Sequence, residues 1–171
     1  MAFAHDLVNG INPCYKIKKP YKDSRRVRFL TPEEATNLLE KIKDKSLELY
    51  HESILSLFAG LRAGEIHNLH WSDINFDNKS IYIRDPKNKH SRHAYFTPEL
   101  ESILLSKKDE SQKKIDNLVF PSRSGKMRTQ ISASFKRIVE EIGLNEGISD
   151  PRQKVVFHTL RHTFASWLVQ K

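Results

Sequence analysis

The hydrophobic period of this sequence changes midway, and that change limits the possible folds more than any other feature. Over residues 31–71 the apolar residues recur at helical spacing, whereas over 72–96 they alternate with polar residues. Alternation with a period of two is typical of half-buried strands. A turn at 77–79 and a second hairpin over 85–92 divide this stretch into three strands. The sequence therefore predicts an α+β fold that is mainly α, with a small three-stranded antiparallel sheet at one edge.

Local signals mark the helix boundaries on both sides of the predicted sheet. Thr31-Pro32-Glu33-Glu34 combines a capping threonine, a proline at the first helical position and a glutamate that completes a capping box. Gly60 and Gly143 follow apolar periodic segments, as is typical of helix C-termini. The expected helices cover about 31–43, 47–59, 63–70, 97–106 and 131–142, and a short extended piece covers about 117–121.

The stretch 157–167 brings together His158, Arg161 and His162. Thr159 is interpreted as the N-cap of a final helix whose apolar residues recur every four positions. On this interpretation Arg161 and His162 lie in the first turn, where unpaired backbone N–H groups and the helix dipole attract anions. The planar guanidinium of arginine can also bind two phosphate oxygens. These residues alone therefore favour a site that binds phosphate and is suited to phosphoryl transfer.

Charge and composition narrow the choice of partner. The chain of 171 residues carries 29 Lys and Arg against 21 Asp and Glu, a formal net charge of +8, which favours a polyanion such as nucleic acid.

The hydrophobic content is 38%, and the sequence contains neither an apolar run of membrane length nor a signal-peptide core. We therefore expect a soluble, cytoplasmic protein. The single cysteine, Cys14, excludes an internal disulfide and a cysteine-rich metal site.

Basic residues gather in three segments. Residues 1–28 are interpreted as the end of a helix, about 3–9, followed by a basic linker broken by prolines. This linker either lies on a phosphate backbone or is a solvated connector, and the sequence leaves both possibilities open. The hairpin 85–92 and the loop 122–128 present further cations. The candidate DNA-contacting residues are Lys16, Lys18, Lys19, Arg25, Arg26, Arg92, Arg123 and Arg128.

Other site chemistries lack a complete motif. His158 and His162 have the spacing of paired zinc ligands, but Thr159 stands where a metalloprotease needs a glutamate. His67 and His70 have no set of cysteines or carboxylates to complete a zinc site. The sequence contains no nucleophile elbow of a serine hydrolase and no glycine-rich phosphate loop. We therefore expect neither a metal nor a nucleotide cofactor.

Three motifs, in the right order, resemble those of the tyrosine recombinases, the phage integrase family. His158-Thr159-Leu160-Arg161-His162 resembles the family's His-x-x-Arg-His box. Residues 59–74 resemble its first arginine box, and 85–92 resemble its lysine-bearing β-turn. The resemblance covers about residue 31 to the end and implies a helical catalytic domain with the DNA breaking-rejoining enzyme fold. Residues 1–28 resemble the end of a core-binding domain and an interdomain linker, which leaves 29–171 as the catalytic domain.

The resemblance implies that two arginines bind the scissile phosphate. Arg62 and Arg161 would contact its non-bridging oxygens and stabilise the charge of the pentacoordinate transition state. Losing one such contact is expected to lower the rate by a factor on the order of 10²–10³. His158 would assist proton transfer or hold the phosphate.

The resemblance also implies a general acid and supporting residues. Lys87 would protonate the departing 5′ oxygen, and Lys89, two residues away, is the alternative match for this role. Glu65 would orient the site, and His162, which follows the second arginine, would support it.

The nucleophile of the family is a tyrosine that forms a 3′-phosphotyrosyl link, so neither ATP nor a metal is needed. In the family this tyrosine and a third histidine or tryptophan lie some tens of residues beyond the second arginine. The five tyrosines of this chain all precede Arg161. We therefore interpret the chain as a fragment truncated before the nucleophile, and we expect that it does not cleave DNA by itself.

The function implied by the resemblance is site-specific DNA recombination, or integration, for a phage or mobile element. The partner would be double-stranded DNA, and members of the family act as tetramers on paired sites. The alternative is a non-catalytic DNA-binding protein of recombinase ancestry, which a tyrosine codon soon after Lys171 would disfavour. A metal-dependent nuclease would lose activity with a chelator, and a basic RNA-binding domain would need paired surface aromatics that are not seen here.

Overall fold

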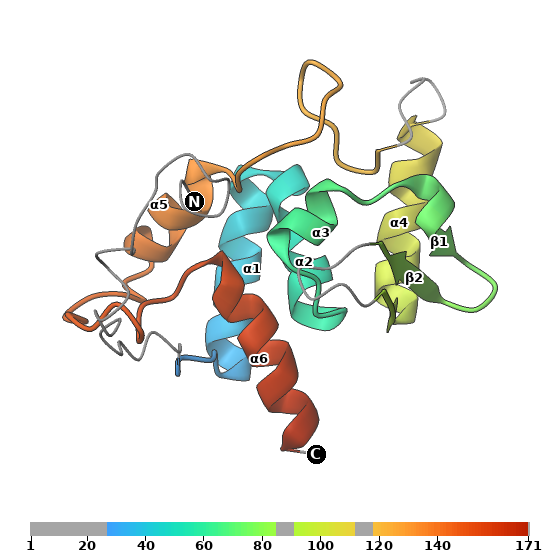
Figure 1. Cartoon of the computed structure of the whole chain (residues 1–171). Coiled ribbons are helices and arrows are strands. Elements are labelled where there is room, and N and C mark those ends of the chain that lie inside the picture. The colour runs from blue at the N-terminus through green and yellow to red at the C-terminus, as the bar shows by residue number, and fades with distance from the viewer. Residues whose placement is uncertain (1–26, 85–90, 112–117, 171) are drawn as a thin grey trace, which may run out of the picture.

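The computed structural model describes residues 27–84, 91–111 and 118–170. Helices dominate the fold, and the three-stranded antiparallel sheet lies at one edge beside α4, on the side opposite α5 (Figure 1). The predicted fold class is therefore confirmed. The elements in chain order are α1 (Pro32–Lys45), α2 (Leu47–Phe58), α3 (Ala63–His67), the 3-10 helix η2 (Trp71–Asp73), β1 (Ile74–Asn75), β2 (Ser80–Ile83), β3 (Arg92–Tyr95), α4 (Pro98–Ser111), α5 (Ala133–Glu141) and α6 (Phe157–Val169).

The strands are ordered β1-β2-β3, and their register follows the alternation in the sequence. Ile81 of β2 lies opposite Ala94 of β3, and both side chains are buried. Alternate residues such as Tyr82 and Tyr95 are exposed. Because a one-residue slip would turn the apolar set to solvent, burial of one face fixes the register. This register places Arg92, the first residue of β3, opposite Ile83.

The first helix begins where its capping box predicts, and the second follows a serine that caps it. The Thr31 side chain accepts a hydrogen bond from the backbone N–H of Glu34, and the Glu34 carboxylate accepts one from the backbone N–H of Thr31, which completes the capping box. Ser46 ends α1 and caps α2, with its hydroxyl accepting from the backbone N–H of Leu49. These two caps position α1 and α2 as a tightly connected antiparallel pair, which packs together in the core.

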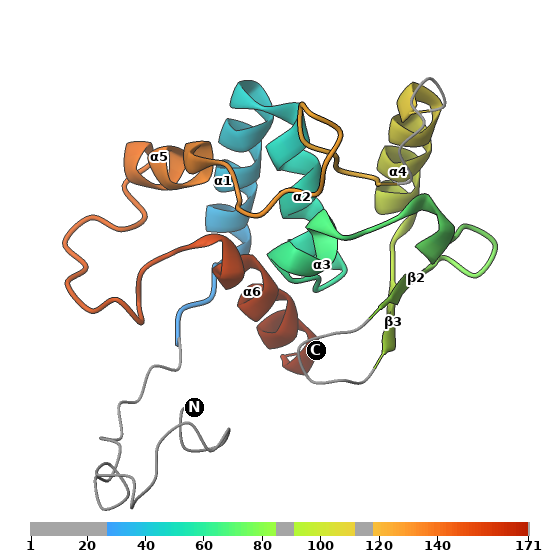
Figure 2. The ribbon, with the colours of Figure 1, turned by 45° about the horizontal axis from the view of Figure 1, so that its top comes forward.

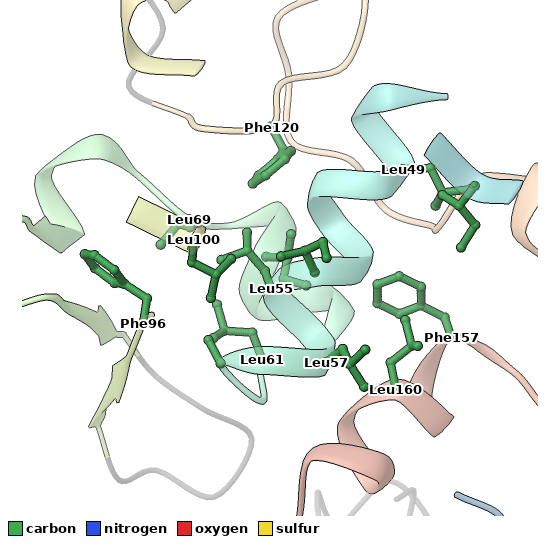
Figure 3. Packing of buried hydrophobic residues seen from close by; sticks show 14 of the residues in the cluster. Leu49, Leu55, Leu57, Leu61, Leu69, Phe96, Leu100, Phe120, Phe157 and Leu160 are labelled. Atoms are coloured by element: carbon green, nitrogen blue, oxygen red, sulfur yellow. The ribbon is translucent and has the colours of Figure 1, made fainter. Parts of the chain in front are cut away.

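Helix α2 is the centre of the hydrophobic core. It packs against α1, α3, α4 and α6, and its residues Leu49, Ile54, Leu55 and Leu57 are almost fully buried. Figure 3 shows Leu57 near Phe157 and Leu160 of α6, while Leu55 points to the opposite half of the core, which contains Leu100 and Phe120. Because α2 leads directly into the loop that carries Arg62, the core fixes the position of that loop.

Helix α6 is attached to the segment that precedes α1. The buried Thr163 hydroxyl accepts from the backbone N–H of Leu30 at 2.9 Å and donates to the carbonyl of Thr159 at 2.9 Å. One turn further on, the Trp167 indole N–H donates to the carbonyl of Leu30 at 3.2 Å. Both backbone groups of Leu30 are thereby satisfied, and α6 is held against the segment that leads into α1.

The interpretation of Thr159 as the N-cap of this helix is wrong. The cap is Val156, the helix begins at Phe157, and Thr159 is the third helical residue. Its hydroxyl accepts instead from the backbone N–H of Val156 at 3.0 Å. Phe157 joins the helix because its ring packs against that of Phe135, with centroids 5.4 Å apart. His158 is consequently in the first turn, and Arg161 lies in the second.

Two helices differ in length from the sequence prediction. Helix α3 ends at His67, because the next residues leave the helix to pair with the segment at Leu118, where the backbone N–H of Val119 donates to the carbonyl of Leu69. Helix α4 continues to Ser111, since the Lys107 ammonium is paired with Glu48 of α2 at 3.0 Å. In the part of the chain that the structure describes, no helix is long and apolar enough to cross a membrane.

Candidate active site

The carboxylate of Glu65 is the point on which the candidate site converges. Glu65 is the third residue of α3, and its side chain is only 8% exposed. One oxygen accepts from the backbone N–H of Arg62 at 2.8 Å, and the other accepts from the Arg62 guanidinium at 2.7 Å. Because both contacts lie within one short turn, the first arginine motif organises itself locally.

Two further arginines reach the same carboxylate from distant elements. Arg92 of β3 donates to both Glu65 oxygens, at 2.9 and 2.8 Å, in a bidentate pair. Arg161 of α6 lies 3.9 Å from one of these oxygens and donates to the carbonyl of Gly60. Figure 2 shows the sheet on the far side of α3 from α1. Because α3 and α6 both pack against α2, residues that are far apart in the sequence meet at this carboxylate.

The cluster is strongly cationic, since three guanidinium groups face one carboxylate. Burial tends to raise the pKa of Glu65, but hydrogen bonds from Arg92 and from the backbone and side chain of Arg62 outweigh it and lower the pKa to about 2. Burial, followed by the charges of Arg62 and Arg92, lowers the pKa of Arg161. A site with excess positive charge that is partly removed from water attracts an anion. The arrangement can therefore bind a phosphate through guanidinium groups that are already held in place.

A glycine makes the contact between α6 and the arginine loop possible. Gly60 has φ of +65°, and a Cβ atom at this position would lie 2.5 Å from Cδ1 of Phe164. Only glycine fits both the backbone conformation and the close approach of the aromatic ring. The same residue supplies the carbonyl that accepts from Arg161. The glycine expected to end a helix is therefore also part of the geometry of the site.

The two predicted histidines lie on α6 beside Arg161. His158 is exposed and His162 is half-buried. Their rings meet edge to face, with centroids 4.7 Å apart. His158 is three residues before Arg161, so both project from the same face of the helix. The structure therefore places the His158 imidazole on the same face of α6 as Arg161.

A groove of about 670 Å³ extends from the cluster between β3 and α6. Arg92 and Arg161 form part of its wall, and Phe164, Leu168 and Val169 supply much of the apolar lining. Leu168 is 60% exposed and Val169 is 87% exposed. An apolar face therefore lies directly beside a cationic one.

The remaining predicted site residues are distributed differently. Arg123 is exposed in the loop after Phe120. Arg128 donates to Glu48 and Glu52 of α2 and to the carbonyl of Pro121, so its guanidinium points towards the protein. The predicted residues that lie outside the described residues are Lys16, Lys18, Lys19, Arg25, Arg26, Lys87 and Lys89, together with the helix expected at 3–9.

The pairing of Arg128 belongs to a buried ionic cluster that the sequence did not indicate. Glu52 is 1% exposed and His67 is 2% exposed, and His67 Nε2 lies 3.7 Å from Glu52 Oε1. Burial raises the pKa of Glu52 to about 7, although the charge of Arg128 opposes it. Burial and then the Arg128 charge lower the pKa of His67. The sequence feature that could have indicated this cluster is Glu52 itself, a carboxylate among the apolar residues of α2.

The pairing of Arg92 with Glu65 was also missed by sequence reasoning, which assigned Arg92 to DNA contact. The two residues are 27 positions apart, and no local pattern joins them. Among residues 27–84, 91–111 and 118–170, no group of three or more histidine, cysteine, aspartate or glutamate residues is arranged to hold a metal ion.

The fold and the site together define the class of this protein: a mainly helical α+β domain in which converging arginines form a preformed anion site. Residues 28–171 match the model of the phage integrase family. The chain belongs to this family, as its three motifs suggest.

Relatives and solved structures agree with this assignment. The chain is 30% identical over 167 residues to the integrase of Salmonella phage P22, covering 90% of this chain and 40% of that protein. It is 32% identical over 160 residues to a tyrosine recombinase of Pseudothermotoga lettingae, covering 94% and 53%. The chain spans about half the length of the curated relatives it matches.

Two solved structures have the same fold. The crystal structure of XerA recombinase has a TM-score of 0.64 at 25% identity, covering 85% of this chain and 52% of that one. The Tn1549 transposon integrase in complex with transposon right end DNA has a TM-score of 0.71 at 20% identity, covering 88% and 56%. At the lower identity the likeness concerns the fold alone.

Proposed function

We propose that the protein to which this chain belongs is a site-specific DNA recombinase, or integrase, that cleaves and rejoins DNA through a 3′-phosphotyrosyl intermediate. The observation that carries the proposal is the convergence of Arg62 and Arg161, the arginines of two family motifs, on the buried carboxylate of Glu65. In this role both guanidiniums bind non-bridging oxygens of the scissile phosphate. They stabilise the additional negative charge that develops when phosphorus becomes pentacoordinate.

The reaction needs a nucleophile and a proton donor. A tyrosine hydroxyl attacks phosphorus, the bond from phosphorus to the 5′ oxygen breaks, and that oxygen takes up a proton. By family resemblance Lys87 is the donor, with Lys89 as the alternative, and His158 assists proton transfer. The position of His158 three residues before Arg161 on α6 supports its part in this scheme. Because the phosphotyrosyl bond conserves the energy of the broken diester, rejoining requires no ATP.

All five tyrosines of this chain precede Arg161, whereas the family's nucleophile follows the second arginine. We therefore expect this chain alone to bind duplex DNA without cleaving it. We assign residues 1–28 to the end of a core-binding domain and a linker, and 29–171 to the catalytic domain. The family match over 28–171 supports that boundary.

The proposed partner is double-stranded DNA, bound by a homo-oligomer. Among the family relatives of known fold, lambda integrase is described as a dimer bound to a core site and as a tetramer bound to a Holliday junction. By family resemblance we propose a tetramer on paired DNA sites for this protein as well. We place it in the bacterial cytoplasm, where such DNA lies.

Covalent capture tests this function. The gene-encoded protein that contains this chain would be mixed with random-sequence duplexes that each carry a central nick, in the presence of EDTA. Nicking lets the cleaved fragment diffuse away, so a phosphotyrosyl adduct accumulates and survives denaturation. Sequencing of the adducts would then give the preferred DNA site. We expect adducts with the wild-type protein and none with Arg161→Ala. Undiminished DNA binding without any adduct would instead identify a non-catalytic DNA-binding protein.

A further inference from the structure

Arg92 differs from the other cations of the site because its guanidinium forms a bidentate pair with a protein carboxylate. Both of its terminal nitrogens donate to Glu65, one to each oxygen. An arginine that contacts DNA would need to present such donors to the solvent. The two hydrogen bonds direct its guanidinium at Glu65, within the cluster.

The carboxylate that Arg92 holds is the one that positions Arg62 and approaches Arg161. Glu65 Oε1 accepts from Arg62 as well as from Arg92, and Glu65 Oε2 lies near Arg161. A bidentate pair fixes the plane of a carboxylate, whereas a single hydrogen bond leaves it able to rotate. Arg62 donates one hydrogen bond to each Glu65 oxygen from within the same turn, and Arg92 adds a second to each. Arg92 therefore ties the orientation of the Glu65 oxygens to β3.

The backbone of Arg92 is fixed as firmly as its side chain. It is the first residue of β3 and pairs with Ile83, which is 4% exposed in the core. Helix α3 packs against α2, and β3 pairs with β2 in the sheet. The Arg92–Glu65 pair is thus a direct polar connection between the sheet and the loop that carries Arg62.

We propose that Arg92 is a positioning residue, which acts through Glu65 to hold Arg62 and Arg161 in their phosphate-binding arrangement. This inference deepens the proposed function, on which the catalytic meaning of the arginine pair rests. Arg92 does not itself contact the scissile phosphate. Its loss leaves Glu65 with fewer donors, so Glu65 turns and competes for the guanidiniums that the phosphate should bind.

Three variants of this chain separate positioning from simple charge. Arg92→Gln removes both the charge and the bidentate donor, and Arg92→Lys keeps the charge but loses the planar pair of donors. The matched control is Arg84→Gln. Arg84 follows β2 and pairs with the buried Asp73, in an ion pair that does not include Glu65. All three variants would first be checked for cooperative unfolding.

The first readout is independent of DNA. We would record the side-chain Nε–Hε NMR signals of Arg62 and Arg161 in each variant. We expect both signals to shift and broaden in Arg92→Gln and in Arg92→Lys, and to stay in place in Arg84→Gln. Unchanged Arg62 and Arg161 signals in Arg92→Gln would overturn the proposal.

The second readout is the salt dependence of duplex-DNA binding. Each protein–phosphate contact contributes about −0.9 to the slope of log affinity against log salt. For a positioning residue we expect any fall in the slope of Arg92→Gln to accompany movement of the Arg62 and Arg161 signals, because those two guanidiniums are then turned away from phosphate. A slope reduced by about one contact, with the arginine signals unmoved, would show that Arg92 binds DNA directly. If the covalent-capture test yields no adduct, the proposed function fails, and the NMR readout still decides the role of Arg92.

Discussion

At the scale of single residues, the site depends on the backbone of Gly60 as much as on its charged side chains. A positive φ lets the chain turn sharply from α2 towards α3, and the missing Cβ leaves room for Phe164. That turn presents the Gly60 carbonyl to Arg161. A substitution at this glycine therefore affects the stability of the fold and the orientation of a catalytic candidate together.

We expect Gly60→Ala to destabilise the protein by about 2 kcal/mol or more, because a left-handed conformation and an overpacked contact each cost about 1–2 kcal/mol. Gly64→Ala is the matched control, since a Cβ at Gly64 meets nothing within 4 Å and the residue lies in α3. Alanine there should be neutral or stabilising by up to about 1 kcal/mol. Urea unfolding followed by circular dichroism would measure both. Equal midpoints for the two variants would contradict the assigned role of Gly60.

At the scale of elements, α6 carries Arg161, and its position depends on a few buried hydrogen bonds. The Thr163 hydroxyl accepts a hydrogen bond from the backbone N–H of Leu30, and the Trp167 indole N–H donates one to the Leu30 carbonyl. These contacts connect α6 to the segment before α1 across more than 130 residues of chain. The distance between Arg161 and the arginine loop is therefore set partly at the opposite face of α6.

Thr163→Val tests this attachment, because it leaves the buried backbone N–H of Leu30 without its acceptor. An unsatisfied buried donor costs about 1–3 kcal/mol, and we expect a loss of that size in the free energy of unfolding. Thr36→Val is the control: Thr36 is exposed on α1 and donates to the carbonyl of Pro32 within its own helix. Its effect should stay within about 0.5 kcal/mol. A loss at Thr163 no larger than this would show that α6 is held mainly by apolar packing.

The buried Glu52 of α2 should make stability depend on pH. Its pKa is raised from 4.5 to about 7, so the folded protein binds the proton more tightly than the unfolded chain. Unfolding then releases protons between these two pH values, and the free energy of unfolding falls as the pH rises through that window. Above about 7 the loss is complete. His67 acts in the opposite direction, since its lowered pKa costs stability on the acidic side of 6.5.

Glu52→Gln removes this titration. We expect the free energy of unfolding of the variant, relative to wild type, to increase between pH 4.5 and 7 by an amount on the order of 2–3 kcal/mol. Denaturant unfolding at a series of pH values would measure the difference. Glu40→Gln, at an exposed position on α1, provides the control. A wild-type-like pH profile for Glu52→Gln would mean that Glu52 is ionised throughout, with Arg128 dominating over burial.

At the scale of the whole molecule, the sequence predicts local features well and long-range pairings poorly. The Thr31 cap, the alternation over β2 and the two arginine motifs each depend on neighbours in the chain. The pairs Glu65–Arg92 and Glu52–Arg128 are 27 and 76 residues apart and arise only when the helices pack. The error at Thr159 has the same origin: burial of Phe157 against Phe135 decided where α6 begins. The convergence of Arg62 and Arg161 was reached through the family resemblance, because spacing alone does not bring them together.

Long-range ion pairs, which the sequence does not predict, also decide which cations of the molecule are available to bind DNA. The net charge of +8 counts every arginine equally, although Arg128 is bound to Glu48, Glu52 and Pro121, whereas Arg123 in the same loop is exposed. Only an exposed cation can approach a phosphate and release a counterion from DNA. Arg123 and Arg128 were assigned the same role from the sequence, and the structure predicts that they differ.

We therefore expect Arg123→Gln and Arg128→Gln to separate DNA binding from stability. Arg123→Gln should reduce the slope of log affinity against log salt by about one contact and leave unfolding unchanged. Arg128→Gln should leave the slope unchanged but destabilise the protein by about 2 kcal/mol or more, because it removes the partner of a buried carboxylate. Fluorescence anisotropy with a labelled duplex at several salt concentrations, combined with urea unfolding, would measure both effects. A reduced slope for Arg128→Gln at full stability would show that its guanidinium leaves Glu52 to bind DNA, and that the ionic cluster opens on binding.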